Sequence, residues 1–392
     1  MTTLPQPTKS ISVDPLTVQV IRDVEQWRRL QPEWDELFEA SPTASAPLRF
    51  EWLWHWWRLY GPIYGDQGQG LRILTFRRQS RLIGAIPLYE TVKREWGMQI
   101  RRVEFLSTGE AESEETCADY LDLLHLPEER QACVDALATA LFDKEILSWD
   151  ELELLDMPER SPLLSLRVKH RGCHATVTGD GTCPIADISG GLEAYLARLS
   201  THTRKQLRRQ VRGAQKAGAI LERATEDADV ESYFEDLIRL HQRRWTAVGQ
   251  PGSFASPRFT EFHRTLARCW VPSGKAVLVR LALNGQVLAV IYGFLVGTKF
   301  DFYQSGFALD EPNGLQSPGM VAFLLLKARL AERGVTHFDF LRGTSPYKQR
   351  LATEYCPVMR LSMTRTNARM RLVTLSRLVR RAAAKGRRLF RM

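Results

Sequence analysis

The spacing of apolar residues along the first half of the chain changes from helical periodicity to alternation. In chain order the pattern predicts a helix over 24–40, a helix from about residue 49, strands over 71–76 and 81–89 around a turn, a strand over 119–124, a helix over 127–143 and a strand over 151–155. The second helix carries tryptophans at 52, 54, 56 and 57, which fit core packing or a ligand cleft. Core packing is favoured, because large aromatic side chains are usually buried.

The second half repeats this order of elements. The pattern predicts a hairpin of strands 276–282 and 287–295 around Asn284-Gly285, a strand over 299–304, a helix over 319–333 and a strand over 336–341. Each half thus contains helices, a hairpin, a strand, a helix and a strand. The repeated order indicates a duplicated α/β unit with mixed, mostly antiparallel sheets.

The segment between the halves is strongly charged. Residues 201–218 contain six Lys or Arg and no acid, with Leu207, Val211 and Ala214 at helical spacing. A helix with a solvated basic face is favoured, while binding of phosphate, RNA or an anionic lipid head stays open. A further helix is expected over 230–245.

Composition excludes several classes of protein. The chain has 392 residues, of which 44% are hydrophobic and 25% charged, so it is not disordered, collagen-like or a coiled coil. There is no run of 18 apolar residues, and the N-terminal segment lacks the apolar stretch of a signal peptide. Six scattered cysteines without a C-x-x-C pair argue against a zinc site and indicate a reducing cytoplasm. We therefore expect a cytoplasmic protein of two domains.

The net charge of +9 is concentrated at the C-terminus. Residues 355–392 contain eleven Lys or Arg and no acid, whereas the other 354 residues carry 43 basic and 45 acidic side chains. A helix over 370–391 would place most of its apolar residues on one side and most of its arginines on the other. Such a basic amphipathic helix suits an anionic membrane surface, which would make the protein peripheral to the inner membrane. A disordered tail and a helix packed on the body are the alternatives.

Two segments carry candidate chemistry. Gln316-Ser317-Pro318-Gly319 leads into a helix N-terminus, where backbone N–H groups favour an anion such as a pyrophosphate. An ordinary helix start capped by Ser317 explains this segment equally well. The second segment is 339–348, in which Asp339, Arg342, Tyr347 and Lys348 follow a strand. This set suffices to hold an anionic substrate and to move one proton, although a salt-bridged strand end is the simpler explanation.

Other polar residues share strand faces or stand alone on a helix. Asp301 and Tyr303 lie on one face of their strand, and Asp119 and Tyr120 are their counterparts in the first half. His241 lies on a helix with Arg244 three residues further on. A single helical histidine is more often structural than catalytic.

Motifs of serine hydrolases, P-loop NTPases, zinc proteases and Rossmann enzymes are absent. Several other short segments follow one another in order: Pro32-Glu33-Trp34-Asp35, Phe50-Glu51-Trp52-Leu53-Trp54, Asp119-Tyr120-Leu121-Asp122, the basic run after Thr203, Leu240-His241 with Trp245 and Gly249, Ser317-Pro318-Gly319, and Phe338-Asp339-Phe340-Leu341 with Gly343 and Tyr347-Lys348. In the order and spacing of these segments, the chain resembles bacterial GNAT-superfamily acyltransferases of the cellulose-biosynthesis (CelD-type) family, which are relatives of the Fem-type peptidyltransferases. The resemblance extends over about 32–363.

The resemblance implies two tandem GNAT-like modules, over 1–185 and 186–364, followed by a basic tail over 365–392. It implies acetyl-CoA or another acyl-CoA as the donor, held by Gln316, Ser317, Pro318 and Gly319, since GNAT enzymes carry a Q/R-x-x-G-x-G/A loop there. Val321 stands where that loop has Gly or Ala. Fem-type relatives also depart at this position and use aminoacyl-tRNA, so tRNA is the alternative donor.

The reaction implied is transfer of an acyl group, expected to be acetyl, to an amine of a sugar or small metabolite in exopolysaccharide or envelope synthesis. We expect Asp339 to act as base or substrate anchor, Tyr347 to donate to the leaving group, and Lys348 and Arg342 to hold anionic groups. The further residues expected to bind substrate are Asp301, Tyr303, His241 and Trp245. No metal is expected. A degenerate GNAT domain that serves only as a binding module is the alternative outside enzymology.

Overall fold

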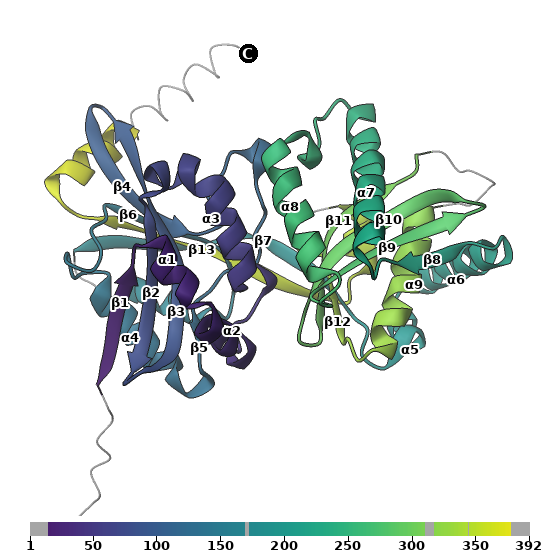
Figure 1. The fold of residues 1–392 in the computed structure, drawn as a ribbon, viewed down its shortest axis with the longest axis horizontal. Coiled ribbons are helices and arrows are strands. Elements are labelled where there is room, and N and C mark those ends of the chain that lie inside the picture. The colour runs from purple at the N-terminus through teal and green to yellow at the C-terminus, as the bar shows by residue number, and fades with distance from the viewer. Residues whose placement is uncertain (1–14, 169–171, 310–316, 344, 378–392) are drawn as a thin grey trace, which may run out of the picture.

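The computed structural model describes residues 15–168, 172–309, 317–343 and 345–377. Two α/β lobes lie side by side, joined by two long strands (Figure 1). The elements of the first lobe are β1 (Leu16–Ile21), α1 (Val24–Arg29), α2 (Gln31–Ala40), α3 (Phe50–Tyr64), β2 (Leu71–Arg78), β3 (Arg81–Glu95), β4 (Met98–Phe105), β5 (Leu124–His125), α4 (Arg130–Ala140) and β6 (Glu151–Pro158).

The second lobe follows β7, the first of the joining strands. Its elements, with the joining strands β7 and β13, are β7 (Cys173–Asp187), α5 (Gly191–Arg198), α6 (Thr201–Lys216), β8 (Ile220–Arg223), α7 (Asp227–Ala247), α8 (Pro257–Trp270), β9 (Ala276–Leu283), β10 (Gln286–Val296), β11 (Lys299–Phe307), α9 (Pro318–Glu332), β12 (His337–Asp339), α10 (Pro346–Leu351) and β13 (Glu354–Arg365). Residues 368–377 form a last described stretch of helix.

One sheet runs through both lobes. Its strand order is β1-β2-β3-β4-β6-β13-β7-β12-β11-β10-β9-β8, and β5 pairs with β3. Among the described strands the β4–β6 and β11–β12 pairs are parallel and the others are antiparallel. Each lobe therefore has an edge strand, helices, a three-stranded meander, a helix and a parallel strand. This arrangement confirms the predicted fold class of two tandem units with mixed, mostly antiparallel sheets.

The two lobes exchange their last strands. β7 follows β6 in the chain but pairs with β12, and β13 follows β12 but pairs with β6. β7 and β13 also pair with each other from Cys173–Arg365 to Ile185–Glu354. As a result, the loop that follows β12 lies against a loop of the first lobe.

Local sequence signals set several element ends. Asn284 and Gly285 adopt φ of 51° and 76°, which is the backbone conformation of a two-residue hairpin turn between β9 and β10. The Ser256 side chain accepts from the Phe259 backbone N–H and caps α8, with Pro257 at its first position. Ser200 caps α6 in the same way.

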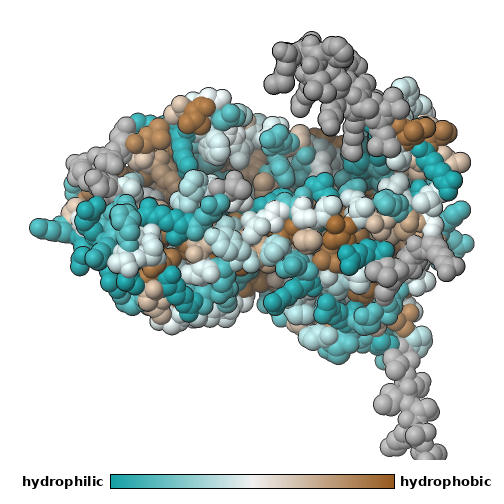
Figure 2. Space-filling view, turned by 180° about the vertical axis from the view of Figure 1, so that it is seen from behind, coloured by the Kyte–Doolittle hydropathy of each residue, from teal (hydrophilic) through white to brown (hydrophobic). Residues whose placement is uncertain are grey.

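Most apolar side chains are buried in two core clusters, one containing the α3 tryptophans and the other lying beneath α9. Trp52 and Trp56 are fully buried and Trp57 nearly so, which confirms the core interpretation of these residues. From behind, the surface is mostly hydrophilic with separate apolar patches (Figure 2).

Two predicted elements need correction. The helix expected over 24–40 is two helices, because Leu30 ends α1 and Pro32 opens α2. The strand expected over 119–124 is wrong except at Leu124, which belongs to the short strand β5. Tyr120 has a φ of 69°, and a left-handed residue cannot continue a strand.

The beginning of the basic tail is a helix packed on the first lobe. Met370 and Val373 are buried against Ile100, while Arg369 pairs with Asp150 and Arg377 with Glu95 and Glu151. Leu372 and Leu375 remain exposed. The rest of the expected helix, from residue 378, lies outside the described residues. Within the described part of the chain no helix is long and apolar enough to cross a membrane.

Candidate active site

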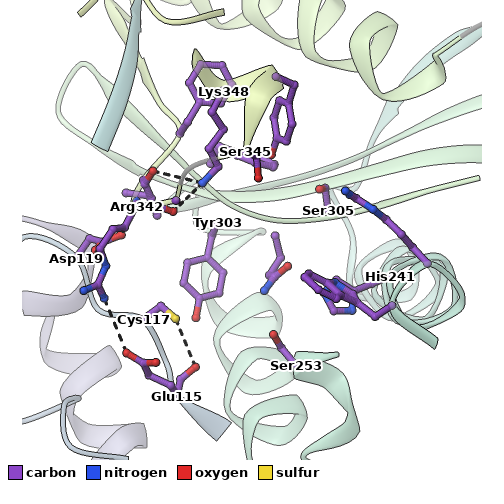
Figure 3. A pocket seen from close by; sticks show the side chains of 18 of the residues that line it. Glu115, Cys117, Asp119, His241, Ser253, Tyr303, Ser305, Arg342, Ser345 and Lys348 are labelled. Atoms are coloured by element: carbon purple, nitrogen blue, oxygen red, sulfur yellow. Dashed lines mark hydrogen bonds and ion pairs between the residues drawn. The ribbon is translucent and has the colours of Figure 1, made fainter. Parts of the chain in front are cut away.

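A pocket of about 510 Å³ lies between the two lobes and is lined by half of the predicted site residues. His241 and Trp245 reach it from α7, Tyr303 from β11, and Tyr347 and Lys348 from α10. Arg342 completes the set from the loop after β12. Tyr303 lies near the centre, with Arg342 and Asp119 on one side and His241 on the other (Figure 3). Residues from four separate parts of the second lobe thus converge on one space.

Asp339 and Asp301 lie beneath this pocket. Asp339 is fully buried, and its Oδ2 accepts a 2.7 Å hydrogen bond from the Tyr120 hydroxyl while Oδ1 accepts from the Leu341 backbone N–H at 2.8 Å. Lys299 Nζ lies 2.9 Å from Asp301 and 3.6 Å from Asp339. Asp339 therefore does not line the pocket, but it holds the Tyr120 hydroxyl and the Leu341 backbone in place.

Burial and the attraction between the Lys299 amine and the two carboxylates determine the pKa values of Asp301 and Lys299. Burial raises the pKa of Asp301 to about 6, and the neighbouring Lys299 opposes part of that increase. Burial by itself lowers the pKa of Lys299, but Asp301 and Asp339 outweigh it and raise the pKa above its ordinary value. Lys299 is accordingly charged at neutral pH.

Arg342 is surrounded by carboxylates. Its guanidinium lies 3.2 Å from Asp119, 2.5 Å from Asp156, and 3.8 Å from both Glu115 and Asp180. Its backbone N–H also donates to Asp119 at 3.0 Å. Sequence reasoning expected Arg342 to hold an anionic substrate, but this guanidinium is already paired with acids of the first lobe and of β7. Its evident effect is to fix the strand end against the first lobe.

Lys348 and Tyr347 extend from α10 into the pocket. Lys348 Nζ donates to the carbonyl oxygens of Arg342 at 2.8 Å and Leu341 at 3.3 Å, and burial lowers the pKa of this amine. Tyr347 stacks on Phe323 with ring centroids 5.7 Å apart. Burial raises the pKa of Tyr347 to about 12, so its hydroxyl keeps its proton at neutral pH.

His241 is a buried and neutral histidine on the pocket wall. Burial lowers the pKa of His241 to about 4. Its Nδ1 lies 3.0 Å from Gln242 Oε1. Because an amide oxygen only accepts, Nδ1 carries the hydrogen and Nε2 keeps its lone pair. This histidine has the protonation state of a proton acceptor.

A second, smaller pocket of about 240 Å³ adjoins the N-terminus of α9. Ser317, Pro318 and Gly319 line it together with Arg244 and Tyr347, both of which also line the first pocket. Ser317 is left-handed, with a φ of 54°, and its side chain makes no capping hydrogen bond to the described residues. The alternative of a Ser-capped helix start is thus not found. Gln316 lies outside the described residues.

Two residues of this segment behave differently from the sequence expectation. A Cβ atom at Gly319 would lie 2.8 Å from the Phe307 ring, so this glycine allows the ring to pack against the helix start. Val321 departs from the GNAT loop pattern, but its side chain is fully buried in the core beneath α9 and does not line the small pocket. The departure at Val321 therefore does not change the lining of the small pocket.

Sequence reasoning missed the contribution of the first lobe and of the loop before α8. Glu115, Cys117 and Asp119 line the first pocket, as does Ser253. Asp119 was singled out in the sequence as a first-half counterpart of Asp301, but neither that equivalence nor the acidic character of the region around Glu115 shows where a loop will lie. No group of three His, Cys, Asp or Glu side chains in the described ranges is placed to hold a metal ion.

Comparisons with known proteins identify the class. Residues 201–349 match the family described as "Acetyltransferase (GNAT) domain". A search of curated proteins found no significant match. The structure is similar to the crystal structure of FemX, with a TM-score of 0.58 and 12% identity over 84% of this chain and 95% of that one. It is also similar to the C-terminal DUF2156 domain of an Agrobacterium fabrum protein described as a lysylphosphatidylglycerol synthetase, with a TM-score of 0.50 and 10% identity over 89% and 95% of the two chains.

The matched segment contains every second-lobe residue that lines the two pockets, including the helix start of α9. The match assigns residues 201–349 to an acetyltransferase (GNAT) domain, and the mixed α/β fold is consistent with it. This domain lies in the second lobe, and the first lobe repeats the same order of elements.

Proposed function

We propose that the protein transfers an acetyl or other acyl group from acyl-CoA to an amine of a sugar or small metabolite. The observation that carries this proposal is the junction of the two pockets at Arg244 and Tyr347. The small pocket offers Arg244 and the Gly319 backbone N–H, which has no hydrogen-bond partner among the described residues, to the donor's pyrophosphate. The larger pocket offers space for the acceptor, so donor and acceptor would meet beside Tyr347.

The reaction joins the acceptor nitrogen to the acyl carbon and breaks the carbon–sulfur bond. One proton leaves the nitrogen and one proton reaches the sulfur. In our proposal His241 Nε2 accepts the first proton and the Tyr347 hydroxyl donates the second. Lys348 holds the acyl oxygen or another anionic group, and burial lowers the pKa of its amine. Asp339, Arg342 and Asp301 position the strand end, while Tyr303 and Trp245 bind the acceptor.

The acceptor site extends beyond the first pocket. A neighbouring hollow of about 700 Å³ shares Trp245 and Ser253 with it. Trp245 is 40% exposed, and an exposed aromatic ring at such a junction suits stacking against a sugar. This shape favours an acceptor longer than a single ring and supports a role in polysaccharide or envelope synthesis, as the CelD-type resemblance implies.

The domain division at residues 185 and 364 belongs to the same proposal, with the second unit as the acyltransferase. We place the protein in the cytoplasm, peripheral to the inner membrane through its basic tail. The exposed Leu372 and Leu375 support that location. Vesicle flotation tests it with the full chain, with a chain ending at residue 377 and with the double variant Leu372→Ser/Leu375→Ser, and equal binding by all three would remove the tail from the proposal.

A second donor is favoured by one observation. Helix α6 exposes Lys205, Arg208, Arg209, Arg212 and Lys216, and of these only Arg208 has an ion-pair partner within the described ranges, Glu193. This surface suits a polyanion such as aminoacyl-tRNA. The Fem-type alternative would use that donor in the same pockets.

Calorimetry on the full chain separates the alternatives. Saturable acetyl-CoA binding that Arg244→Gln weakens supports the acyl-CoA proposal, and Arg243→Gln on the same helix is the matched control. Binding of charged tRNA alone, weakened by α6 charge removal, supports the Fem-type alternative. Binding of neither donor would leave the catalytically inactive binding module.

A further inference from the structure

A separate apolar hollow of about 430 Å³ lies at the opposite end of α9 from the candidate active site. The small pocket of the candidate active site adjoins the first turn of α9, whereas this hollow is lined by Leu326, Arg329, Leu330 and Arg333 from its last turns and C-terminus. At 1.5 Å per residue the two ends of this helix lie about 20 Å apart. The hollow thus belongs to neither the donor nor the acceptor site.

Its walls are aliphatic and come from both the sheet and the helix. Val277 and Val279 of β9 and Leu295 of β10 face Leu326, Leu330 and Val335 across the gap. Most of these side chains are nearly or fully buried, although Leu295 lies partly at the surface. A volume of this size, bounded by apolar side chains, is typical of sites for small apolar ligands. Water in such a space would find few hydrogen-bond partners.

The rim carries three arginines from two different elements. Arg223 comes from β8, while Arg329 and Arg333 come from the C-terminal end of α9. The guanidinium groups of these three residues have no ion-pair or hydrogen-bond partner in the part of the chain that the structure describes, and Glu332 is the single acid of the lining. Cations at a helix C-terminus are favoured by the helix dipole, which accounts for Arg329 and Arg333 but not for Arg223.

Arg223 is the informative member of this set. Its Nε is buried without a hydrogen-bond partner among the described residues. Its chain neighbour Glu222 points to the other face of the sheet, where it pairs with Arg280 at 2.6 Å. A buried guanidinium N–H without an acceptor is costly, and an anion at the rim would satisfy it.

We propose that this hollow binds an anionic amphiphile, with its single apolar chain between α9 and the sheet and its carboxylate or phosphate head among the three arginines. The apolar wall supplies affinity for the chain and the unpaired arginines supply selectivity for the head. The proposal is independent of the acyl-transfer reaction, because no residue of the hollow lines the other pockets.

Calorimetry of the full-length protein with decyl phosphate and decanoate, below their micelle concentrations, tests the site. Saturable binding is expected for both probes, at least tenfold weaker binding for decanol, and no displacement by saturating acetyl-CoA. Arg223→Gln should weaken decyl phosphate at least tenfold, as expected for loss of one charge-assisted hydrogen bond. Arg58→Gln removes the same charge from an exposed position of α3, outside the hollow, and should leave binding unchanged.

A second variant, on the apolar wall, tests the site without changing any arginine. Leu295→Trp adds bulk at the partly exposed wall and should abolish binding while thiol release from acetyl-CoA stays at the wild-type rate. Equal affinity for decanol and decyl phosphate would overturn the proposal, as would full binding by both variants. Phosphatidylglycerol vesicles distinguish the source of the head group. Binding to these vesicles that Leu295→Trp does not reduce, without binding of the free probes, would show surface attraction and also overturn it.

Discussion

Tyr120 of the first lobe donates a 2.7 Å hydrogen bond to Asp339 of the second lobe, although 219 positions of the chain separate them. The preceding residue, Asp119, pairs with Arg342 at 3.2 Å. Two adjacent residues of one loop therefore hold both ends of the short segment that follows β12. This segment carries the backbone carbonyls to which Lys348 donates.

Removing the Arg342 guanidinium from the contact between the lobes should lower the free energy of unfolding substantially. Arg342→Met would leave Asp119 and Asp156 buried without their shared partner, and we expect a loss of about 3–5 kcal/mol in the free energy of unfolding. Urea unfolding measures this loss. Arg360→Met is the matched control, since its ion pair with Asp180 is about half exposed on the arginine side and should be worth less than about 1 kcal/mol. Equal losses in the two variants would contradict the assigned role of Arg342.

The Tyr120–Asp339 bond can be measured separately. Tyr120→Phe leaves a buried carboxylate with one donor fewer, so we expect about 1–3 kcal/mol of destabilisation. Combining this change with Asp339→Asn in a double-mutant cycle isolates the pair. A coupling energy near zero would mean that the hydrogen bond contributes nothing to the contact between the lobes.

The duplication could be predicted from sequence, but this contact could not. Asp119 was predicted as the first-half counterpart of Asp301, whereas the structure shows that the loop with Asp119 and Tyr120 binds the strand end at Asp339 and Arg342 in the other half. The reason is the exchange of β7 and β13. Gly179, Asp180 and Gly181 look like a turn, but they form a bulge opposite Val358 and Met359 within a long strand pair. Because of this bulge, the Asp180 carboxylate lies 3.8 Å from the Arg342 guanidinium.

Within the candidate site, closeness along the chain correctly predicted which residues share a pocket only for the segment 342–348. Arg342, Tyr347 and Lys348 are close along the chain and line one pocket. His241 and Tyr303 join them because α7 packs on β11, which the helical and alternating patterns predict only as separate elements. Asp339 shows the opposite error, since a polar strand-end residue was expected in the pocket and lies buried beneath it.

Gly319→Ala should weaken donor binding. The new Cβ would lie 2.8 Å from the Phe307 ring, which lines the small pocket, so the ring must move into that space. We expect the KM for acyl-CoA to rise about tenfold, together with an overpacking cost of about 1–3 kcal/mol. Gly213→Ala on α6 is the control, because nothing lies within 4 Å of its added Cβ and alanine favours the helix. An unchanged KM in Gly319→Ala would exclude the small pocket as the donor site.

Tyr347→Phe removes the proposed proton donor while keeping its stacking on Phe323. We expect kcat to fall about 100-fold, in line with the usual contribution of a general acid, with little change in KM or in unfolding free energy. Steady-state thiol release measures both constants. Tyr355→Phe, at an exposed position on β13 outside the pockets, should behave as wild type. Wild-type kcat in Tyr347→Phe would remove this residue from the reaction.

His241 should link stability and activity to pH in the same direction. Its pKa is about 4 in the folded protein and near 6.5 when unfolded, so the unfolded chain binds more protons between these values. Stability is therefore fully present above about pH 6.5 and declines as the pH falls towards 4.

The fully buried His263, whose pKa burial also lowers, adds to this slope, so His241→Gln should flatten it without abolishing it. The same variant should lower kcat about 100-fold at neutral pH if His241 accepts the proton. His174→Gln changes an exposed histidine on β7 and should alter neither property. Urea unfolding and kcat/KM, each measured from pH 5 to 8, check both expectations. A flattened stability slope with wild-type kcat would make His241 a structural residue, whereas loss of activity with an unchanged slope would contradict its neutral, buried state.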